Sequence, residues 1–127
     1  MADTDSYGAM LLEMLAPLGP VQIRRMFGGA GVFLDGLMFG LVSDDVLYFK
    51  ADDGNRAAYE AESMAPFTYA KQGGRATLTS YWRAPERLLD EHDELEAWAR
   101  AAVGAARRAN LARATKARPS PAKRTKV

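Results

Sequence analysis

The chain has 127 residues, 48% of them hydrophobic, which is enough for one domain with a buried core. It contains no cysteine, so disulfides, thiolate metal sites and thiol nucleophiles are excluded. No segment approaches the roughly eighteen apolar residues of a membrane span, and the N-terminal stretch is acidic rather than basic, so we expect a cytoplasmic protein.

The formal charge of +1 conceals two oppositely charged parts of the chain. Residues 1–106 contain 9 basic and 16 acidic residues, a net charge of −7, whereas residues 107–127 contain 8 basic residues and no acidic one. We therefore predict a domain over residues 1–110 and a basic tail over residues 111–127. The tail has too few apolar residues to offset its ordering entropy, so we expect it to be disordered when free.

The first predicted element is an amphipathic helix. Apolar residues recur at i, i+3, i+4, i+7 and i+8 between Tyr7 and Leu15, and this spacing places them on one helical face. Asp5 or Ser6 is suited to cap its first turn.

Three strands follow this helix. Residues 29–34 and 37–42 predict two strands joined by the dipeptide Asp35-Gly36, which accepts the positive φ angles of a type I′ turn. A second polar turn leads into a third strand over residues 46–50. The three strands form an antiparallel meander.

The second half of the domain begins with a short helix, for which Asp52 and Asp53 are natural N-caps and which ends near Glu62. Residues 67–69 and 76–81 predict two more strands, joined by a hairpin turn that contains two adjacent glycines.

A long final helix ends the domain. Pro85 opens a short helical turn, and from Asp90 as cap an apolar stripe that includes Trp98 predicts a helix to Ala106 or Asn110. The predicted order is α-βββ-α-ββ-α. This order indicates an α+β fold with two layers, a mainly antiparallel sheet packed against the terminal helices.

The glycine-rich segment 27–31 and the single histidine each have two interpretations. The glycines resemble a phosphate-cradling loop, but they lead into a strand rather than a helix, which favours a bulge or close packing. His92 lies among carboxylates, as in a weak metal site, but no second imidazole or thiolate accompanies it, which favours an exposed histidine at a helix start. No catalytic constellation is present, so we predict a protein that is not an enzyme and has no metal or cofactor.

Two further segments carry candidate contacts with partners. Arg24 and Arg25 are suited to bind an acidic partner or nucleic-acid phosphate, and the alternative is an ion pair with carboxylates of the same domain. The sequence Tyr81-Trp82-Arg83 has the composition of a platform for stacked bases. For Trp82 we favour core anchoring against a terminal helix.

The basic tail carries the strongest physical argument for a partner. Its cations are suited to neutralise phosphates and release counterions without forming a fold, whereas the alternative is a solubilising tail that folds back on the acidic domain. The candidate nucleic-acid-binding residues are Arg107, Arg108, Arg113, Lys116, Arg118, Lys123, Arg124 and Lys126.

Several separated segments resemble the TfoX/Sxy N-terminal domain family, in the same order and with the family's spacing, across roughly residues 5–108. These segments are residues 24–36, 39–42, 47–50, 66–69 and 80–85. The resemblance implies a two-layer α/β domain of the type seen in secretion chaperones. Full-length members of this family look like regulators of natural competence genes that work with the cyclic-AMP receptor protein on promoters. They carry a second, helical C-terminal domain where this chain has its basic tail, so we interpret the chain as a stand-alone member.

Two functional hypotheses follow from the sequence. The first is a non-enzymatic regulatory domain that acts by protein contact, for which the resemblance implies a transcription factor of the cyclic-AMP receptor type as partner, with non-specific DNA or RNA binding through the tail. The alternative is a protein-interaction module or homodimer with an inert, solubilising tail. Loss of nucleic-acid binding on removal of residues 111–127 distinguishes the first hypothesis from the second.

Overall fold

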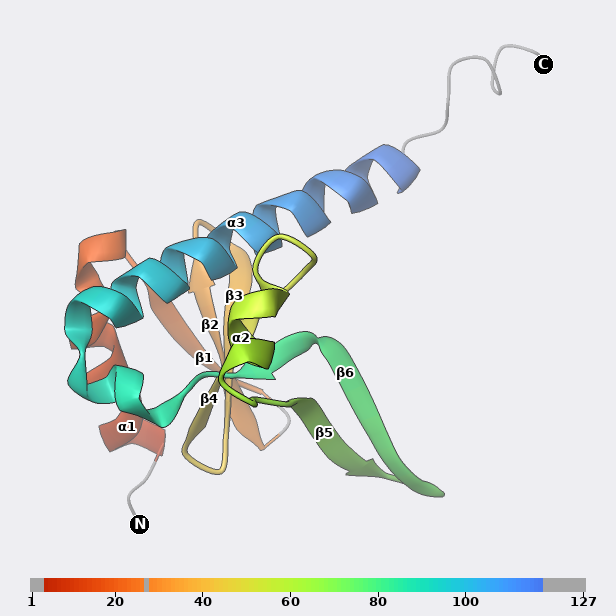
Figure 1. Ribbon diagram of the computed structural model, residues 1–127, viewed down its shortest axis with the longest axis horizontal. Coiled ribbons are helices and arrows are strands. Elements are labelled where there is room, and N and C mark those ends of the chain that lie inside the picture. The colour runs from red at the N-terminus through yellow and green to blue at the C-terminus, as the bar shows by residue number, and fades with distance from the viewer. Residues whose placement is uncertain (1–3, 27, 118–127) are drawn as a thin grey trace.

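The structure is a computed structural model that describes residues 4–26 and 28–117 (Figure 1). One antiparallel six-stranded sheet has the strand order β1-β2-β3-β4-β6-β5. Its elements, in chain order, are α1 (Thr4–Met14), the 3-10 turn η1 (Ala16–Leu18), β1 (Gln22–Met26), β2 (Gly29–Leu34), β3 (Leu37–Ser43), β4 (Val46–Lys50), α2 (Arg56–Ala61), β5 (Pro66–Lys71), β6 (Gly74–Arg83), the 3-10 turn η2 (Glu86–Asp90) and α3 (His92–Ala117).

Tight turns fix the register of the central meander. Asp35 and Gly36 have φ values of 54° and 79°, and Asp44 and Asp45 have φ values of 53° and 60°. Both pairs therefore form two-residue turns with positive φ at each central position, which match the twist of the flanking strands. The predicted strands of this meander and the α+β class are confirmed.

Strand β1 was missing from the predicted order, so the prediction of five strands is wrong and the observed order is α-ββββ-α-ββ-α. This segment reads Gln-Ile-Arg-Arg-Met and pairs only with β2, antiparallel, at one edge of the sheet. Edge strands carry charged residues that blunt the unpaired backbone, and those charges weaken the alternation of apolar and polar residues by which a strand is recognised.

The predicted helix boundaries also need correction. Helix α1 begins at Thr4, so Asp5 and Ser6 lie inside its first turn rather than in front of it. Asp90 ends η2 instead of capping α3. Helix α3 continues to Ala117, so residues 111–117 of the predicted disordered tail are helical.

The core lies between the helices and one face of the sheet. Val32, Val42 and Phe49 project from adjacent strands on this face and are at most 2% exposed. Leu11 of α1 and Leu95 of α3 are fully buried in the same cluster. Because successive strand residues point to opposite faces, the helices cover one face and leave the other to its own side chains.

Ion pairs around Arg87 join three elements on the outside of this helical layer. Its guanidinium pairs with Glu62 after α2, and with Glu91 and Glu94 at the start of α3. The hydrogen bonds from Arg87 lower the pKa of the Glu94 carboxyl to about 2. The β5–β6 hairpin, by contrast, projects away from the body of the molecule (Figure 1).

Candidate interaction site

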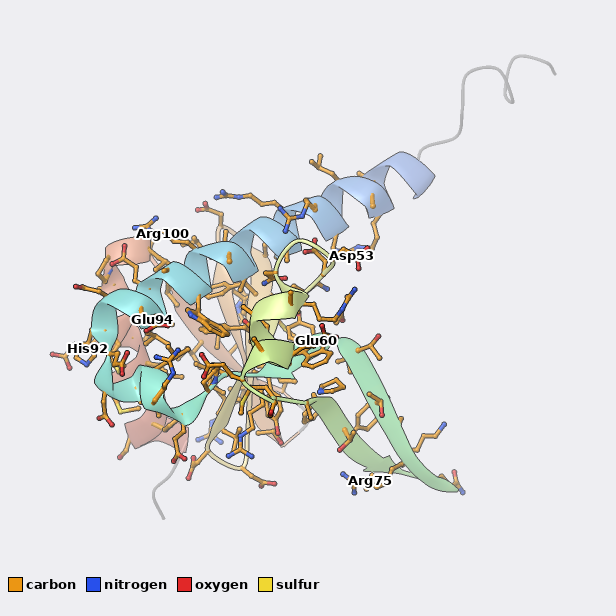
Figure 2. The ribbon with its side chains drawn as sticks, in the orientation of Figure 1. Asp53, Glu60, Arg75, His92, Glu94 and Arg100 are labelled. Atoms are coloured by element: carbon orange, nitrogen blue, oxygen red, sulfur yellow. The ribbon has the colours of Figure 1, made fainter. Side chains whose placement is uncertain are left out.

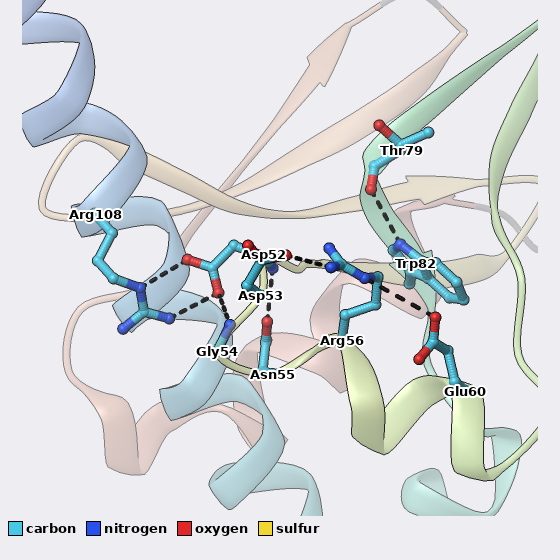
Figure 3. Close-up of polar contacts among 9 residues, drawn as sticks. All are labelled: Asp52, Asp53, Gly54, Asn55, Arg56, Glu60, Thr79, Trp82 and Arg108. Carbon is cyan, nitrogen blue, oxygen red and sulfur yellow. Dashed lines mark hydrogen bonds and ion pairs between the residues drawn. The ribbon is translucent and has the colours of Figure 1, made fainter.

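Two of the candidate nucleic-acid-binding residues pair with carboxylates within the domain. The Arg108 guanidinium binds Asp52 with two parallel hydrogen bonds, from Nε to Oδ2 at 2.7 Å and from Nη2 to Oδ1 at 2.9 Å (Figure 3). Arg107 Nη2 lies 3.9 Å from Asp35 Oδ2 in the β2–β3 turn. These two pairs tie the middle of α3 to two loops at one end of the sheet.

The loop that holds Asp52 is built around this carboxylate. Its Oδ1 also accepts a hydrogen bond from the Gly54 backbone N–H at 2.8 Å, and the Asp52 N–H donates to Asn55 Oδ1 at 2.8 Å. The Arg108 hydrogen bond lowers the pKa of Asp52 against the opposing effect of burial, and the Gly54 N–H lowers it further. Helix α2 begins at Arg56, so the prediction of Asp52 or Asp53 as its N-cap is wrong: Asp52 holds the loop and α3 instead.

The other candidate cations lie farther along the chain. Arg113 is exposed on the C-terminal part of α3, and Lys116 belongs to the last turn of that helix. Burial lowers the pKa of Lys50 at the end of β4, and the positive charge of Arg113 lowers it further. Arg118, Lys123, Arg124 and Lys126 lie outside the described residues.

The candidate partner-binding residues Arg24 and Arg25 are both exposed on the edge strand β1. The Arg24 guanidinium lies 4.7 Å from the centre of the Phe33 ring and donates a hydrogen bond to Gln22 Oε1 at 3.3 Å. Among the described residues, Arg24 thus contacts an aromatic ring and an amide rather than a carboxylate.

The sequence Tyr81-Trp82-Arg83 does not form one stacking platform, because its side chains alternate between the two faces of β6. Trp82 lies 6.3 Å from the ring of Tyr59, which itself contacts Trp98 edge to face at 4.8 Å. The core role expected of Trp82 is confirmed, although its aromatic neighbour belongs to α2. Tyr81 is buried on the opposite face and donates a hydrogen bond to the Met38 carbonyl at 3.2 Å.

The glycine-rich segment and His92 follow their structural interpretations. A Cβ on Gly29 would lie 2.2 Å from the Val42 carbonyl oxygen, and one on Gly31 would lie 2.8 Å from the Phe33 ring, so these glycines permit close packing within the sheet. His92 points outward at the start of α3 (Figure 2). Among residues 4–26 and 28–117, no group of three His, Asp or Glu side chains is placed to hold a metal ion.

A small cavity that the sequence did not reveal lies where β6 leaves the sheet. It is lined by Tyr7, Asp45, Arg83 and Glu86, among others, and has a volume of about 60 Å³. Burial raises the pKa of Tyr7, as do the negative charges of Asp45 and Glu86. Pockets for small molecules measure about 300–1,000 Å³, so this cavity fits no more than a few water molecules.

Comparison with known proteins gives a matching family and a relative. Residues 13–106 match the TfoX N-terminal domain family. Protein Sxy of Escherichia coli (strain K12) is 33% identical over 76 residues, which make up 60% of this chain and 36% of that protein. The matched region therefore spans about a third of the relative's length. In the part of the chain that the structure describes, no helix has the length and apolar character needed to cross a membrane.

Proposed function

Because the chain belongs to the TfoX N-terminal domain family, we propose that it is a non-enzymatic regulatory domain that acts by contact with other macromolecules. Its protein partner is a transcription factor of the cyclic-AMP receptor type, and Arg24 and Arg25 on the exposed edge of the sheet take part in that contact. The C-terminal part of α3 and the residues after it add affinity for DNA or RNA that does not depend on sequence.

The observation that supports this proposal most is the course of α3 beyond the core. Its apolar stripe ends at Ala106, which is 3% exposed, but the helix continues to Ala117. This extension leads away from the sheet (Figure 1), and Arg113 on it is exposed. Because Arg107 and Arg108 pair with Asp35 and Asp52, the helical segment that carries Arg113 leaves the sheet from a fixed base.

Charge neutralisation within the full chain tests the contribution of this extension. One variant replaces with glutamine the six cations beyond the anchoring pair: Arg113, Lys116, Arg118, Lys123, Arg124 and Lys126. Six phosphate contacts would give the unmodified chain a slope of about −5 in log K against log salt on duplex DNA. We expect the variant to lose most of this slope and most of its affinity at low salt.

A matched control removes two cations from the helical layer, by Arg56→Gln and Arg100→Gln, and should leave the slope unchanged. Binding that resists salt, or that survives neutralisation of all six cations, would refute the role of the extension.

A second candidate function is a homodimer or protein-interaction module with no role for the cations. The exposed Leu111 favours it, because 66% of this residue is accessible on the α3 extension. Large apolar residues in such positions often belong to protein interfaces. Sedimentation of the full chain and of Leu111→Gln tests the homodimer: a dimer that dissociates in the variant supports it, and a monomer in both removes it.

A further inference from the structure

Every charged residue in the six strands is basic. The strands contain none of the sixteen acidic residues of the chain. The strand cations are Arg24, Arg25, Lys50, Lys71, Arg75 and Arg83. The sheet of a domain whose first 106 residues carry a net charge of −7 is therefore positively charged, and the acidic residues that the structure describes lie in helices, turns and loops.

The face of the sheet turned away from the core, here called the open face, carries aromatic and apolar side chains. Register places Leu41 opposite Gly31 and Tyr48, and places Tyr48 opposite Arg83, so these positions form a row across four strands. Leu41 and Tyr48 remain partly exposed, whereas Val42 on the core face is 2% exposed. The open face thus keeps apolar surface in contact with solvent.

Aromatic rings extend this face onto the β5–β6 hairpin. Tyr48 contacts Phe67 edge to face at 4.8 Å, and the Phe67 ring lies nearly parallel to that of Tyr69, with 5.8 Å between their centres and 20° between their planes. Tyr69 is 43% exposed at the end of this series, and Leu78, which pairs with Phe67, is 37% exposed. Tyr69 therefore presents an accessible ring beside a preformed aromatic cluster.

Cations also lie next to other aromatic rings of the open face. Lys50 Nζ lies 5.0 Å from the centre of the Tyr81 ring, and Arg24 lies over Phe33 at 4.7 Å. Lys71 follows Tyr69 by two residues on the same strand, which places both side chains on one face. The open face therefore has cations near aromatic rings on β1, β4 and β5.

We propose that the open face binds single-stranded nucleic acid, with Tyr69 as a stacking surface for a base and with Lys50 and Lys71 as phosphate contacts. Bases of a single strand offer planar faces to aromatic rings, and its phosphates complement a face whose strand charges are all positive. An acidic peptide does not offer a planar group at every charged unit as a nucleotide does, a duplex hides its base faces, and a second copy of this chain would bring two positive faces together. This site is built from strand residues, whereas the proposed function rests on the α3 extension, of which Arg113 is close enough for its charge to act on Lys50.

Binding of a fluorescent ten-nucleotide oligo(dT) by the full chain tests the proposal. Tyr69→Ala should weaken binding about tenfold, which corresponds to the loss of one stacked base, and Tyr69→Phe should bind as the unmodified chain does. Lys71→Gln should reduce the magnitude of the salt slope by about 0.7, the effect of one lost phosphate contact on a single strand. Arg56→Gln on α2 provides the charge-matched control and should change neither quantity.

Three results would overturn the proposal. The first is unchanged oligo(dT) affinity in Tyr69→Ala. The second is an equal loss of duplex affinity in that variant, since stacking on Tyr69 requires an unpaired base. The third is displacement of oligo(dT) by polyglutamate with the same dependence on Tyr69, which would assign the face to an acidic protein segment. This test is independent of the proposed DNA binding by the α3 extension. Neutralising the cations of the extension should leave the ratio of the oligo(dT) affinities of Tyr69→Ala and Tyr69→Phe unchanged.

Discussion

The buried hydroxyl of Tyr59 allows a sharp prediction about stability. This residue is 1% exposed, and its hydroxyl has no hydrogen-bond partner among the described residues. Its ring packs against Trp98 and Trp82. Tyr59→Phe keeps both ring contacts and removes only the unpaired group.

The expected magnitude follows from the penalty for burying an unpaired polar group. That penalty is about 1 to 3 kcal/mol, so we expect Tyr59→Phe to raise the free energy of unfolding by about 1 to 2 kcal/mol. The midpoint of thermal unfolding should rise by about 4 °C for each kcal/mol. Tyr59→Ala, which also loses the ring, should lower stability by about 3 to 5 kcal/mol.

Dependence on pH provides an independent check of the same residue. Burial raises the pKa of Tyr59 in the folded state above the value of 10.0 that applies to the unfolded chain. The unfolded chain therefore releases this proton first, and stability falls as pH rises above 10, by about 1.4 kcal/mol per pH unit for this group. Tyr59→Phe should flatten that decline.

Urea unfolding of both variants at pH 7 and pH 10.5 measures these quantities. A loss of more than about 0.5 kcal/mol in Tyr59→Phe at pH 7 would show that the hydroxyl has a partner, and would refute the reasoning.

Three further predictions concern packing and charge. The carboxyl of Asp52 should titrate below 3.8 by NMR, and Arg108→Gln should raise that midpoint and speed amide exchange in the α3 extension; an unchanged midpoint would contradict the pairing. Glu94 should titrate near pH 2, so its stabilising effect is present above pH 4.5 and is lost toward pH 2. Arg87→Gln should move the Glu94 midpoint toward 4.5, and no movement would contradict the assignment. Gly29→Ala, whose Cβ would meet a carbonyl oxygen of β3 at 2.2 Å, should lower stability by about 1 to 3 kcal/mol in urea unfolding, and a neutral result would contradict the close contact.

The parts of the fold that could be predicted depend on local chemistry. The Asp35-Gly36 turn and the apolar period of α3 are determined by residues close together in the sequence, and both are confirmed by the structure. The pair between Asp52 and Arg108 joins residues 56 positions apart, so its geometry arises only when α3 crosses the end of the sheet. Asp52 was consequently interpreted as a helix cap, which is the local role that its residue type favours.

The aromatic residues of the open face are present in the sequence, but only the strand pairing shows that they lie together. Tyr48 and Tyr69 lie in different predicted strands, and nothing in their spacing shows that Phe67 bridges them. The bulge between β5 and β6 shifts the register by several residues, and it decides which side chains share a face. The predicted strands also contain no acidic residue, but Lys50 is their single cation. The observed strand bounds add the other strand cations, Arg24, Arg25, Lys71, Arg75 and Arg83.

The most direct test of the proposed regulatory role maps duplex DNA onto the full chain by amide chemical shifts at low and high salt. We predict that the largest shifts fall from residue 111 onward, beginning in the α3 extension, and that they vanish at high salt. Shifts that avoid this extension, or that persist at high salt, would contradict the account.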